Sequence, residues 1–329
     1  MTREYRRELD VALNAVRIAA RLCRSVQSAI TTESLAKKDN SPVTVADFGS
    51  QAVICRQLRA EFPGDPVIGE EGAAELRADG GSAFLEQVVR EVGKVGIIGD
   101  PGEICDWIDH GGAQDFSPRF WTLDPIDGTK GFLRREQYAI SLALIINGQI
   151  ELGVLGCPNM PYPGREEPGV LAWAVRGYGA WQQPLGDDSA DAIPVRVSAT
   201  SQVSDLLFCE SVESGHSSHD WSGLIAGELG IRKVPVRMDS QCKYLAVARG
   251  DADLYLRLPT RKGYAEKIWD HAGGVILVEE AGGQVTDIAG RVCDFRQGST
   301  LVKNEGMAVT NGRVHPFVIQ AIRKHRPQE

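Results

Sequence analysis

The sequence predicts an α/β protein of the α+β kind, with two domains. Three observations predict it. Residues 1–190 show helical periodicity and then strong hairpin signals, whereas residues 191–329 alternate strand-like and helix-like segments. A loop-forming stretch, QQPLGDDSADAIP, lies between the two patterns, and we place the boundary within 184–197. We therefore expect an antiparallel sheet with helices in the first domain and a smaller α/β second domain.

Helices are expected first along the chain. Apolar residues recur every three or four positions over residues 4–30, which predicts a long amphipathic helix, and the polar stretch 32–43 breaks it. Residues 45–62 predict a second helix, because Pro63-Gly64 stops the pattern. One further helix is expected near 82–94, inside a long segment rich in glycine and polar residues.

Strands follow. A short strand at 66–69 runs directly into Glu70-Glu71, and WTL before residue 124 predicts another, with DPIDGT as the turn at its end. Asn147-Gly148 separates two apolar runs, which is a strong signal for a hairpin with a type I′ turn. A second hairpin is expected around RGYG, between VLAWAV and AWQQ.

The second half predicts strands and helices in alternation, ending with a helix. The segment 267–283 predicts one helix with a Gly-Gly stop. The expected strands are LLFCES, VPVRM, DADLYLRL, QVTD and MAVTNG, and the other expected helices are 219–229, 240–249 and 316–324.

Composition excludes several classes of protein. The net charge of −8 argues against non-specific binding to nucleic acid or to an anionic membrane. The N-terminus has no apolar signal region, and the longest apolar tract is interrupted by polar residues, so no membrane span is expected. The seven cysteines are far apart and form no C-x-x-C, which favours reduced, buried thiols and a cytoplasmic protein.

Acidic residues at the ends of apolar segments carry the chemical signal. In DPIDGT, Asp124 and Asp127 can face one point, while the rigid Pro125 lets the carbonyl of Ile126 join them. Carboxylate and carbonyl oxygens are the ligands that Mg²⁺ prefers, and Mg²⁺ usually keeps positions open for water and phosphate. The hydroxyl of Thr129 follows at a helix start, where it can orient a water molecule or a phosphate oxygen.

Each of these residues also has a purely structural interpretation. An isolated D-P-x-D is usually a surface turn, Asp47 alone is a typical helix cap, and Glu70-Glu71 alone is typical solvated charge. The combination favours a site, because Glu70, Asp124 and Asp270 all follow or open apolar elements, where open sites tend to form.

The motifs together resemble those of the inositol monophosphatase superfamily. The resemblance is carried by GEE at 69–71, WTLDPIDGT at 121–129 and WDHAGG at 269–274. Longer stretches resemble the 3′(2′),5′-bisphosphate nucleotidases within it: SPVTVADFGSQAV, DPIDGTKGFLR, HSSHD, DSQCKY, YLRLP and EKIWDHAGG. The resemblance implies a two-domain layered sugar-phosphatase fold and a lithium-sensitive, Mg²⁺-dependent phosphatase.

The resemblance also implies a set of metal ligands. Glu70, Asp124 and the carbonyl of Ile126 match the ligands of one Mg²⁺. Asp124, Asp127 and Asp270 match those of a second, so that Asp124 bridges the two ions. Glu70 also serves a weaker third ion, which gives up to three ions per site and a place for inhibitory Li⁺. Asp47 and Thr129 match the pair that activates the attacking water.

Substrate binding is expected from the second half. His216, Ser240, Lys243 and Arg257 match positions that hold the nucleotide, while His219 is expected to be structural, as is His271. The implied reaction is hydrolysis of the 3′-phosphate of adenosine 3′,5′-bisphosphate (PAP) to AMP and phosphate, with related activity on 3′-phosphoadenosine 5′-phosphosulfate (PAPS).

Two alternatives stay open at this point. The substrate could be an inositol bisphosphate, as for an inositol polyphosphate 1-phosphatase, or the protein could be a nucleotide-binding regulator without turnover. We expect a monomer acting on a small molecule. One departure from the family pattern is Arg135, where a small glycine is expected after FLR.

Overall fold

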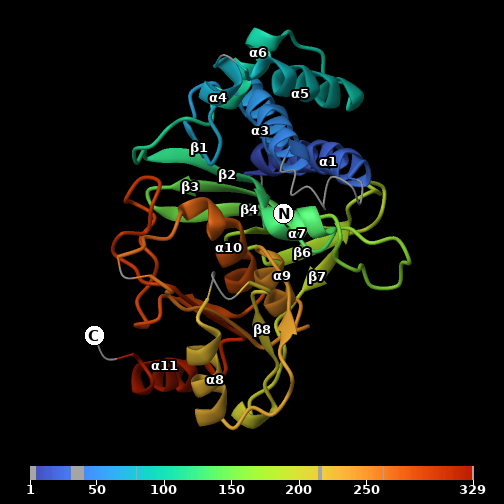
Figure 1. The fold of residues 1–329 in the computed structure, drawn as a ribbon. Coiled ribbons are helices and arrows are strands. Elements are labelled where there is room, and N and C mark those ends of the chain that lie inside the picture. Colours follow the sequence, from blue (N-terminus) through green and yellow to red (C-terminus); the bar gives the residue numbers. More distant parts are fainter. Residues whose placement is uncertain (1–4, 31–40, 79, 214–216, 262, 328–329) are drawn as a thin grey trace.

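The elements of the chain stack in five alternating layers (Figure 1). The computed structural model describes residues 5–30, 41–78, 80–213, 217–261 and 263–327. Helices α1 and α3 cover one face of a seven-stranded sheet, and α9 and α10 lie between this sheet and a five-stranded one. Helices α8 and α11 lie on the outer side of the second sheet. The mixed α/β fold class is therefore confirmed.

The first sheet has the strand order β1-β2-β3-β4-β5-β6-β7. Only β1 and β2 run parallel, and every other neighbouring pair is antiparallel. The strands are β1 (Val67–Gly69), β2 (Arg119–Asp127), β3 (Ala139–Ile146), β4 (Gln149–Cys157), β5 (Val170–Val175), β6 (Ala180–Pro184) and β7 (Ile193–Val195).

Both faces of this sheet are buried, and β3 shows how. Ile140, Leu142 and Leu144 belong to the core shared with α1 (Arg6–Ser28) and α3 (Ser41–Glu61). Ala139, Ala143 and Ile145 alternate with them and belong to the core on the side of α10. Side chains on a strand alternate between faces, so a strand buried on both sides is apolar throughout. The central strands therefore form a rigid platform.

The second sheet has the order β11-β12-β10-β8-β9, and its β8, β9 and β10 run parallel. Its strands are β8 (Phe208–Glu210), β9 (Val236–Arg237), β10 (Leu254–Arg257), β11 (Gln284–Thr286) and β12 (Met307–Thr310). The helices of this half are η1 (Val203–Asp205), α8 (His219–Glu228), α9 (Cys242–Ala248), η2 (Ile268–Asp270), α10 (Ala272–Glu280) and α11 (His315–Lys324).

Most element predictions are confirmed. The predicted hairpin turn has positive φ at both Asn147 (52°) and Gly148 (81°), as a type I′ turn requires. Helix α5 (Ser82–Lys94) and the strand before Glu70 lie where they were expected. All seven cysteines are free and buried, as predicted. Division of the chain at residue 190 stays a prediction; β7, just beyond it, pairs with the first sheet.

Four element predictions need correction. Helix α3 begins at Ser41 rather than 45, since proline is tolerated in the first turn of a helix. The segment 72–118 contains two further short helices, α4 (Ala74–Arg77) and α6 (Pro101–Asp109). The helix expected over 267–283 is interrupted at His271, whose φ is −134°. DPID is not a turn beyond the strand, because β2 continues through it.

No helix among the described residues is long and apolar enough to cross a membrane.

Candidate active site

The predicted site residues meet in one cavity of about 670 Å³. Its walls come from α3, the ends of β1 and β2, the start of α7 (Thr129–Arg134), the segment before α9, the end of β10, and η2. Ten predicted residues line it: Asp47, Glu70, Asp124, Ile126, Asp127, Thr129, Ser240, Lys243, Arg257 and Asp270. The eleventh, His216, lies outside the described residues.

The end of β2 is shaped by a break in the strand ladder. Asp124 pairs with β3 in register, and the register shifts before Asp127 does so. This irregularity accommodates Pro125, which cannot donate to a ladder, and the Pro125 carbonyl accepts a hydrogen bond from Ser50 Oγ at 3.0 Å. Gly128 follows with φ of 91°, where a Cβ would lie 2.9 Å from that of Ser240. The bulged end of β2 thus places the carboxylates of Asp124 and Asp127 in the wall of the cavity.

A buried glutamine fixes the Glu70-Glu71 turn. Gln51 Nε2 donates to the carbonyls of Glu71 (2.6 Å) and Ile108 (2.9 Å), and its Oε1 accepts from the Glu71 N–H at 3.1 Å. Gly69 is needed here, since a Cβ would lie 2.7 Å from Gln51 Oε1. Sequence reasoning missed Gln51, because nothing local distinguishes it from other helical glutamines.

A second buried glutamine, Gln241, joins the two halves of the site. Its backbone N–H donates to Asp127 Oδ2 at 2.5 Å. Its side-chain Nε2 donates to the Trp269 carbonyl at 2.8 Å, and its Oε1 accepts from the N–H of Gly274 at 3.0 Å. Asp127 on β2 and the segment carrying Asp270 are therefore held by one side chain and its backbone.

The carboxylates are crowded and poorly hydrated. Burial, and next the negative charge of Glu70, raise the pKa of Asp124 well above its usual range. Burial and Asp270 raise the pKa of Glu70 to about 8, and the same two causes raise that of Asp127 to about 6. Burial, followed by Glu71 and Glu70, raises the pKa of Asp47.

These features fit a divalent cation. Asp124 Oδ1 is buried and has no hydrogen-bond partner, although buried polar atoms are normally paired. Clustered carboxylates of this kind are stabilised by a hard cation with oxygen ligands, and Mg²⁺ is of that type. Glu70, Asp124, Asp127 and Asp270 all line the cavity and offer carboxylate oxygens of the kind that such a cation takes.

Two largely buried cationic side chains, those of Lys243 and Arg257, line the same cavity; Lys130 also lines it but is exposed and pairs with Glu213 at 2.9 Å. Lys243 is buried, donates from Nζ to the Ser240 carbonyl at 2.9 Å, and lies 5.1 Å from the centre of the Tyr255 ring. Burial lowers the pKa of Lys243, and Asp127 opposes that effect. Arg257 Nη2 lies 3.6 Å from Asp270 Oδ2. Both cations are largely buried rather than solvated.

Sequence reasoning missed Glu266, which lies behind Arg257. Glu266, Asp270 and His271 bring ligand atoms within 4.8 Å of one another. Glu266 Oε2 forms an ion pair with Arg257 Nε at 2.8 Å and contacts His271 Nε2 at 3.3 Å. We therefore read this group as an ion-pair network. The spacing of Glu266 and His271 gives no signal until the fold brings Arg257 beside them.

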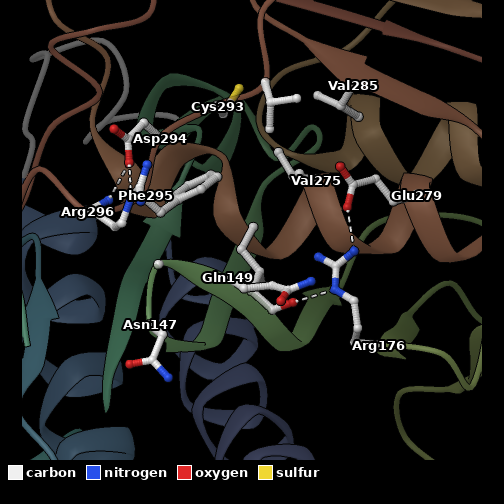
Figure 2. A pocket seen from close by; sticks show the side chains of 13 residues that line it. Asn147, Gln149, Arg176, Val275, Glu279, Val285, Cys293, Asp294, Phe295 and Arg296 are labelled. Atoms are coloured by element: carbon white, nitrogen blue, oxygen red, sulfur yellow. Dashed lines mark hydrogen bonds and ion pairs between the residues drawn. The ribbon is translucent and has the colours of Figure 1, made fainter. Parts of the chain in front are cut away.

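A second cavity of about 420 Å³ lies at the far end of α10 (Figure 2). Its charged side chains neutralise each other: Arg176 pairs with Glu279 at 2.9 Å, and Arg296 pairs with Asp294 at 2.8 Å. The remaining wall includes apolar groups such as Val275. The first cavity concentrates uncompensated carboxylates and is therefore the candidate active site.

Comparison with known proteins agrees with this assignment. The family model described as "Inositol monophosphatase family" matches residues 4–326. The chain belongs to the inositol monophosphatase family. This family consists of Mg²⁺-dependent phosphatases.

Several similar proteins bear the name 3′(2′),5′-bisphosphate nucleotidase. The chain is 42% identical over 335 residues to a 3′(2′),5′-bisphosphate nucleotidase of Schizosaccharomyces pombe, covering 95% of this chain and 94% of the relative. It is 43% identical over 339 residues to a 3′(2′),5′-bisphosphate nucleotidase of Oryza sativa, covering 97% and 94%.

Solved structures of the family share the fold. An inositol monophosphatase from Zymomonas mobilis matches with a TM-score of 0.64 at 18% identity, covering 98% of this chain and 100% of that one. CysQ from Bacteroides thetaiotaomicron, a bacterial member of the family, matches with a TM-score of 0.62 at 20% identity, covering 94% and 99%.

Proposed function

We propose that this protein is a Mg²⁺-dependent 3′(2′),5′-bisphosphate nucleotidase. It hydrolyses the 3′-phosphate of PAP to AMP and phosphate, and it acts on PAPS by the same reaction. The relatives that bear this name cover nearly the whole chain at about 40% identity, which supports the proposal.

The observation that carries the proposal is the division of charge within one cavity. Glu70, Asp124 and Asp127 come from the ends of β1 and β2 in the first half of the chain, whereas Lys243 and Arg257 come from the second half. A bisphosphate needs both: a metal-binding side for the phosphate that reacts and fixed cations for the one that does not. The volume of about 670 Å³ is also in the range of small-ligand sites.

The metal-binding residues are proposed as follows. Glu70, Asp124, the Ile126 carbonyl, Asp127 and Asp270 would hold the Mg²⁺, up to three ions per site. Bound Mg²⁺ supplies a water of lowered pKa and neutralises charge on the phosphoryl oxygens. The chain's own contribution is to hold the ester and the attacking water in place.

Asp47 and Thr129 are the proposed water-activating pair. Asp47 is buried on α3, and Thr129 is the first residue of α7. Thr129 Oγ1 accepts a hydrogen bond from the attacking water and its hydroxyl donates one to Asp47. As the water attacks, its proton passes to Thr129 Oγ1 and the Thr129 proton passes to Asp47. Ser240 and Lys243 bind the nucleotide, together with Arg257 and His216.

One assay tests the substrate. We expect Mg²⁺-dependent phosphate release from PAP and PAPS to exceed that from inositol 1,4-bisphosphate and from 3′-AMP. Faster release from the inositol bisphosphate would identify an inositol polyphosphate 1-phosphatase instead. Tight PAP binding with no Mg²⁺-dependent turnover would identify a nucleotide-binding regulator.

Inhibition by lithium is also proposed, because a weakly held Mg²⁺ at Glu70 is the ion that Li⁺ can replace. Activity should fall with added LiCl far more than with KCl at equal ionic strength. An equal response to the two salts would leave only ionic screening and would contradict the proposal.

We further propose that the enzyme works as a cytoplasmic monomer on a small molecule, without binding nucleic acid or membrane. The seven free, buried thiols are consistent with a reducing compartment. Sedimentation of the purified protein tests its oligomeric state.

A further inference from the structure

A chain of buried polar side chains ends at Arg257, one of the cations proposed to bind the substrate. Glu266 is 4% exposed and its Oε2 lies 2.8 Å from Arg257 Nε. The same oxygen lies 3.3 Å from His271 Nε2, and His271 Nδ1 lies 2.8 Å from the hydroxyl of Tyr244. Arg257 ends β10, Tyr244 lies in α9, and Glu266 and His271 flank η2, so the network is built by the tertiary fold.

The protonation pattern of this network is self-consistent. An ionised carboxylate can only accept hydrogen bonds. His271 Nε2 therefore carries a proton and donates a hydrogen bond to Glu266. In the neutral ring Nδ1 then accepts from the Tyr244 hydroxyl. The pKa of Glu266 is lowered to about 2 although burial acts to raise it, because His271 and Arg257 outweigh burial.

The backbone of Glu266 is fixed as well. The Glu266 carbonyl accepts from the N–H of Leu301 at 2.8 Å, and Lys267 forms a bridge with Thr300. Arg257 is the last residue of β10, which is paired with β12. Neither partner of the ion pair therefore needs to be ordered when ligands bind.

Arg257 has two acidic neighbours at unequal distances. Its Nε lies 2.8 Å from Glu266, whereas its Nη2 lies 3.6 Å from Asp270. Only Asp270 lines the cavity; Glu266 does not. With Glu266 neutral or absent, the guanidinium would close on Asp270, because a largely buried cation needs a counter-charge.

We infer that Glu266 is a positioning residue that holds Arg257 off Asp270, so that Asp270 stays open to Mg²⁺ and Arg257 stays available to the second phosphate. This inference rests on the proposed function, in which Asp270 is a metal ligand. Glu266 acts through Arg257 and touches neither substrate nor metal. His271 supports Glu266 by donating a hydrogen bond to its carboxylate, and Tyr244 holds the His271 ring through Nδ1.

The test compares Mg²⁺ binding by calorimetry, without substrate, in three variants. Glu266→Gln keeps the shape and removes the charge, and we expect Mg²⁺ affinity to fall about tenfold and KM for PAP to rise. Glu266→Gln combined with Arg257→Ala removes the competing cation and should restore Mg²⁺ affinity, while KM for PAP stays high. Glu266→Asp, which keeps the charge, should recover part of the loss.

Asp287→Asn is the matched control. Asp287 is also a buried carboxylate paired with an arginine, Arg291, at 2.7 Å, but it does not line the cavity. We expect it to lower thermal stability and leave Mg²⁺ affinity unchanged. The double variant lacks both members of the Glu266–Arg257 pair, so it also tests the inference if Glu266→Gln alone fails to fold.

The outcomes separate the inference from the proposed function. Unchanged Mg²⁺ affinity in folded Glu266→Gln, or a double variant that binds Mg²⁺ as weakly as the single one, would overturn the inference. If the unaltered protein binds Mg²⁺ but releases no phosphate from PAP, the proposed substrate fails while the Mg²⁺ comparison still decides the inference. Absence of Mg²⁺ binding in the unaltered protein would overturn both.

Discussion

At the scale of single residues, Asp47 differs from the other cavity carboxylates. It comes from α3, whereas Glu70, Asp124 and Asp127 come from the neighbouring strand ends. Its pKa is raised by burial first and by Glu71 and Glu70 next, so a neighbouring cation would return it to the ionised form needed in a base. This placement agrees with a role in proton removal rather than in holding metal.

Asp47→Asn should therefore lower kcat about 10²- to 10⁴-fold with little change in KM, because general-base contributions are of that size. Thr129→Ala should fall in the same range, and the double variant should be little worse than either single one. Steady-state kinetics and Mg²⁺ calorimetry measure this. Asp124→Asn is the contrasting variant, since excess Mg²⁺ should partly rescue it; rescue of Asp47→Asn by Mg²⁺ would show that Asp47 is a ligand.

Lys243 allows a second prediction about single residues. Lys243→Ala removes a buried charge, so KM should rise more for PAP than for 3′-AMP, which lacks the second phosphate. Loss of a charge-assisted contact costs about 1.5–3 kcal/mol, which corresponds to roughly 10- to 100-fold. Equal effects on both substrates would mean that Lys243 supports the fold through its bond to Ser240 and does not select the substrate.

At the scale of elements, sequence patterns succeeded where the structure is local. The β3–β4 hairpin and α5 are dictated by turn chemistry and by periodicity. Helix α6 could also have been predicted, because Asp100 and Glu103 form a capping box with Pro101 at the helix start. Sequence patterns failed where long-range contacts decide the local structure, as at the break at His271. The helix that follows, α10, packs so closely on α9 that a Cβ on Gly274 would lie 2.3 Å from Tyr244.

The backbone at the end of α7 explains the departure from the family pattern at Arg135. Arg135 follows the helix with φ of 60°, and its guanidinium donates to the carbonyl of Ile30. Left-handed backbone of this kind favours glycine, which explains why a glycine is expected here. The arginine compensates part of the backbone strain through its side chain.

This account predicts that Arg135→Gly is more stable than Arg135→Ala by about 1 kcal/mol, since both lose the guanidinium and only alanine keeps the strained Cβ. Urea denaturation of the two variants measures the difference. Gly177→Ala is the control for backbone strain without a packing effect. The φ of Gly177 is also positive (78°), and a Cβ there meets nothing within 4 Å. Equal stability of the two Arg135 variants would contradict the account.

At the scale of the whole molecule, the site depends on both halves of the chain. Glu70, Asp124 and Asp127 end strands of the first sheet, whereas Asp270 lies in η2, between the sheets. Sequence analysis could name these residues from motifs alone. It could not supply Gln51, Gln241 or Glu266, because their roles exist only once distant segments meet. Mg²⁺ held by this set would join the two halves.

The metal-free protein should therefore lose stability as pH rises. The folded pKa of Glu70 is raised to about 8 from 4.5, and that of Asp127 to about 6 from 3.8. A group whose pKa is raised by folding contributes to the stability of the folded protein. This contribution is complete below the pKa of the unfolded state and is lost as pH rises through the pKa of the folded state. For these groups that window runs from about pH 4 to pH 8, and within it the carboxylates lose their protons and repel one another.

Added Mg²⁺ should reverse this loss, and so it should raise the Tm more at pH 8 than at pH 6, where protons compete for the same oxygens. At a hundredfold excess over Kd the added stability is about 2.7 kcal/mol. Thermal melts with MgCl₂, against KCl at equal ionic strength, measure the effect, and Asp124→Asn should abolish most of it. A Tm increase of the same size at both pH values would show that Mg²⁺ binds away from these carboxylates, because only a site made of them couples metal binding to their ionisation.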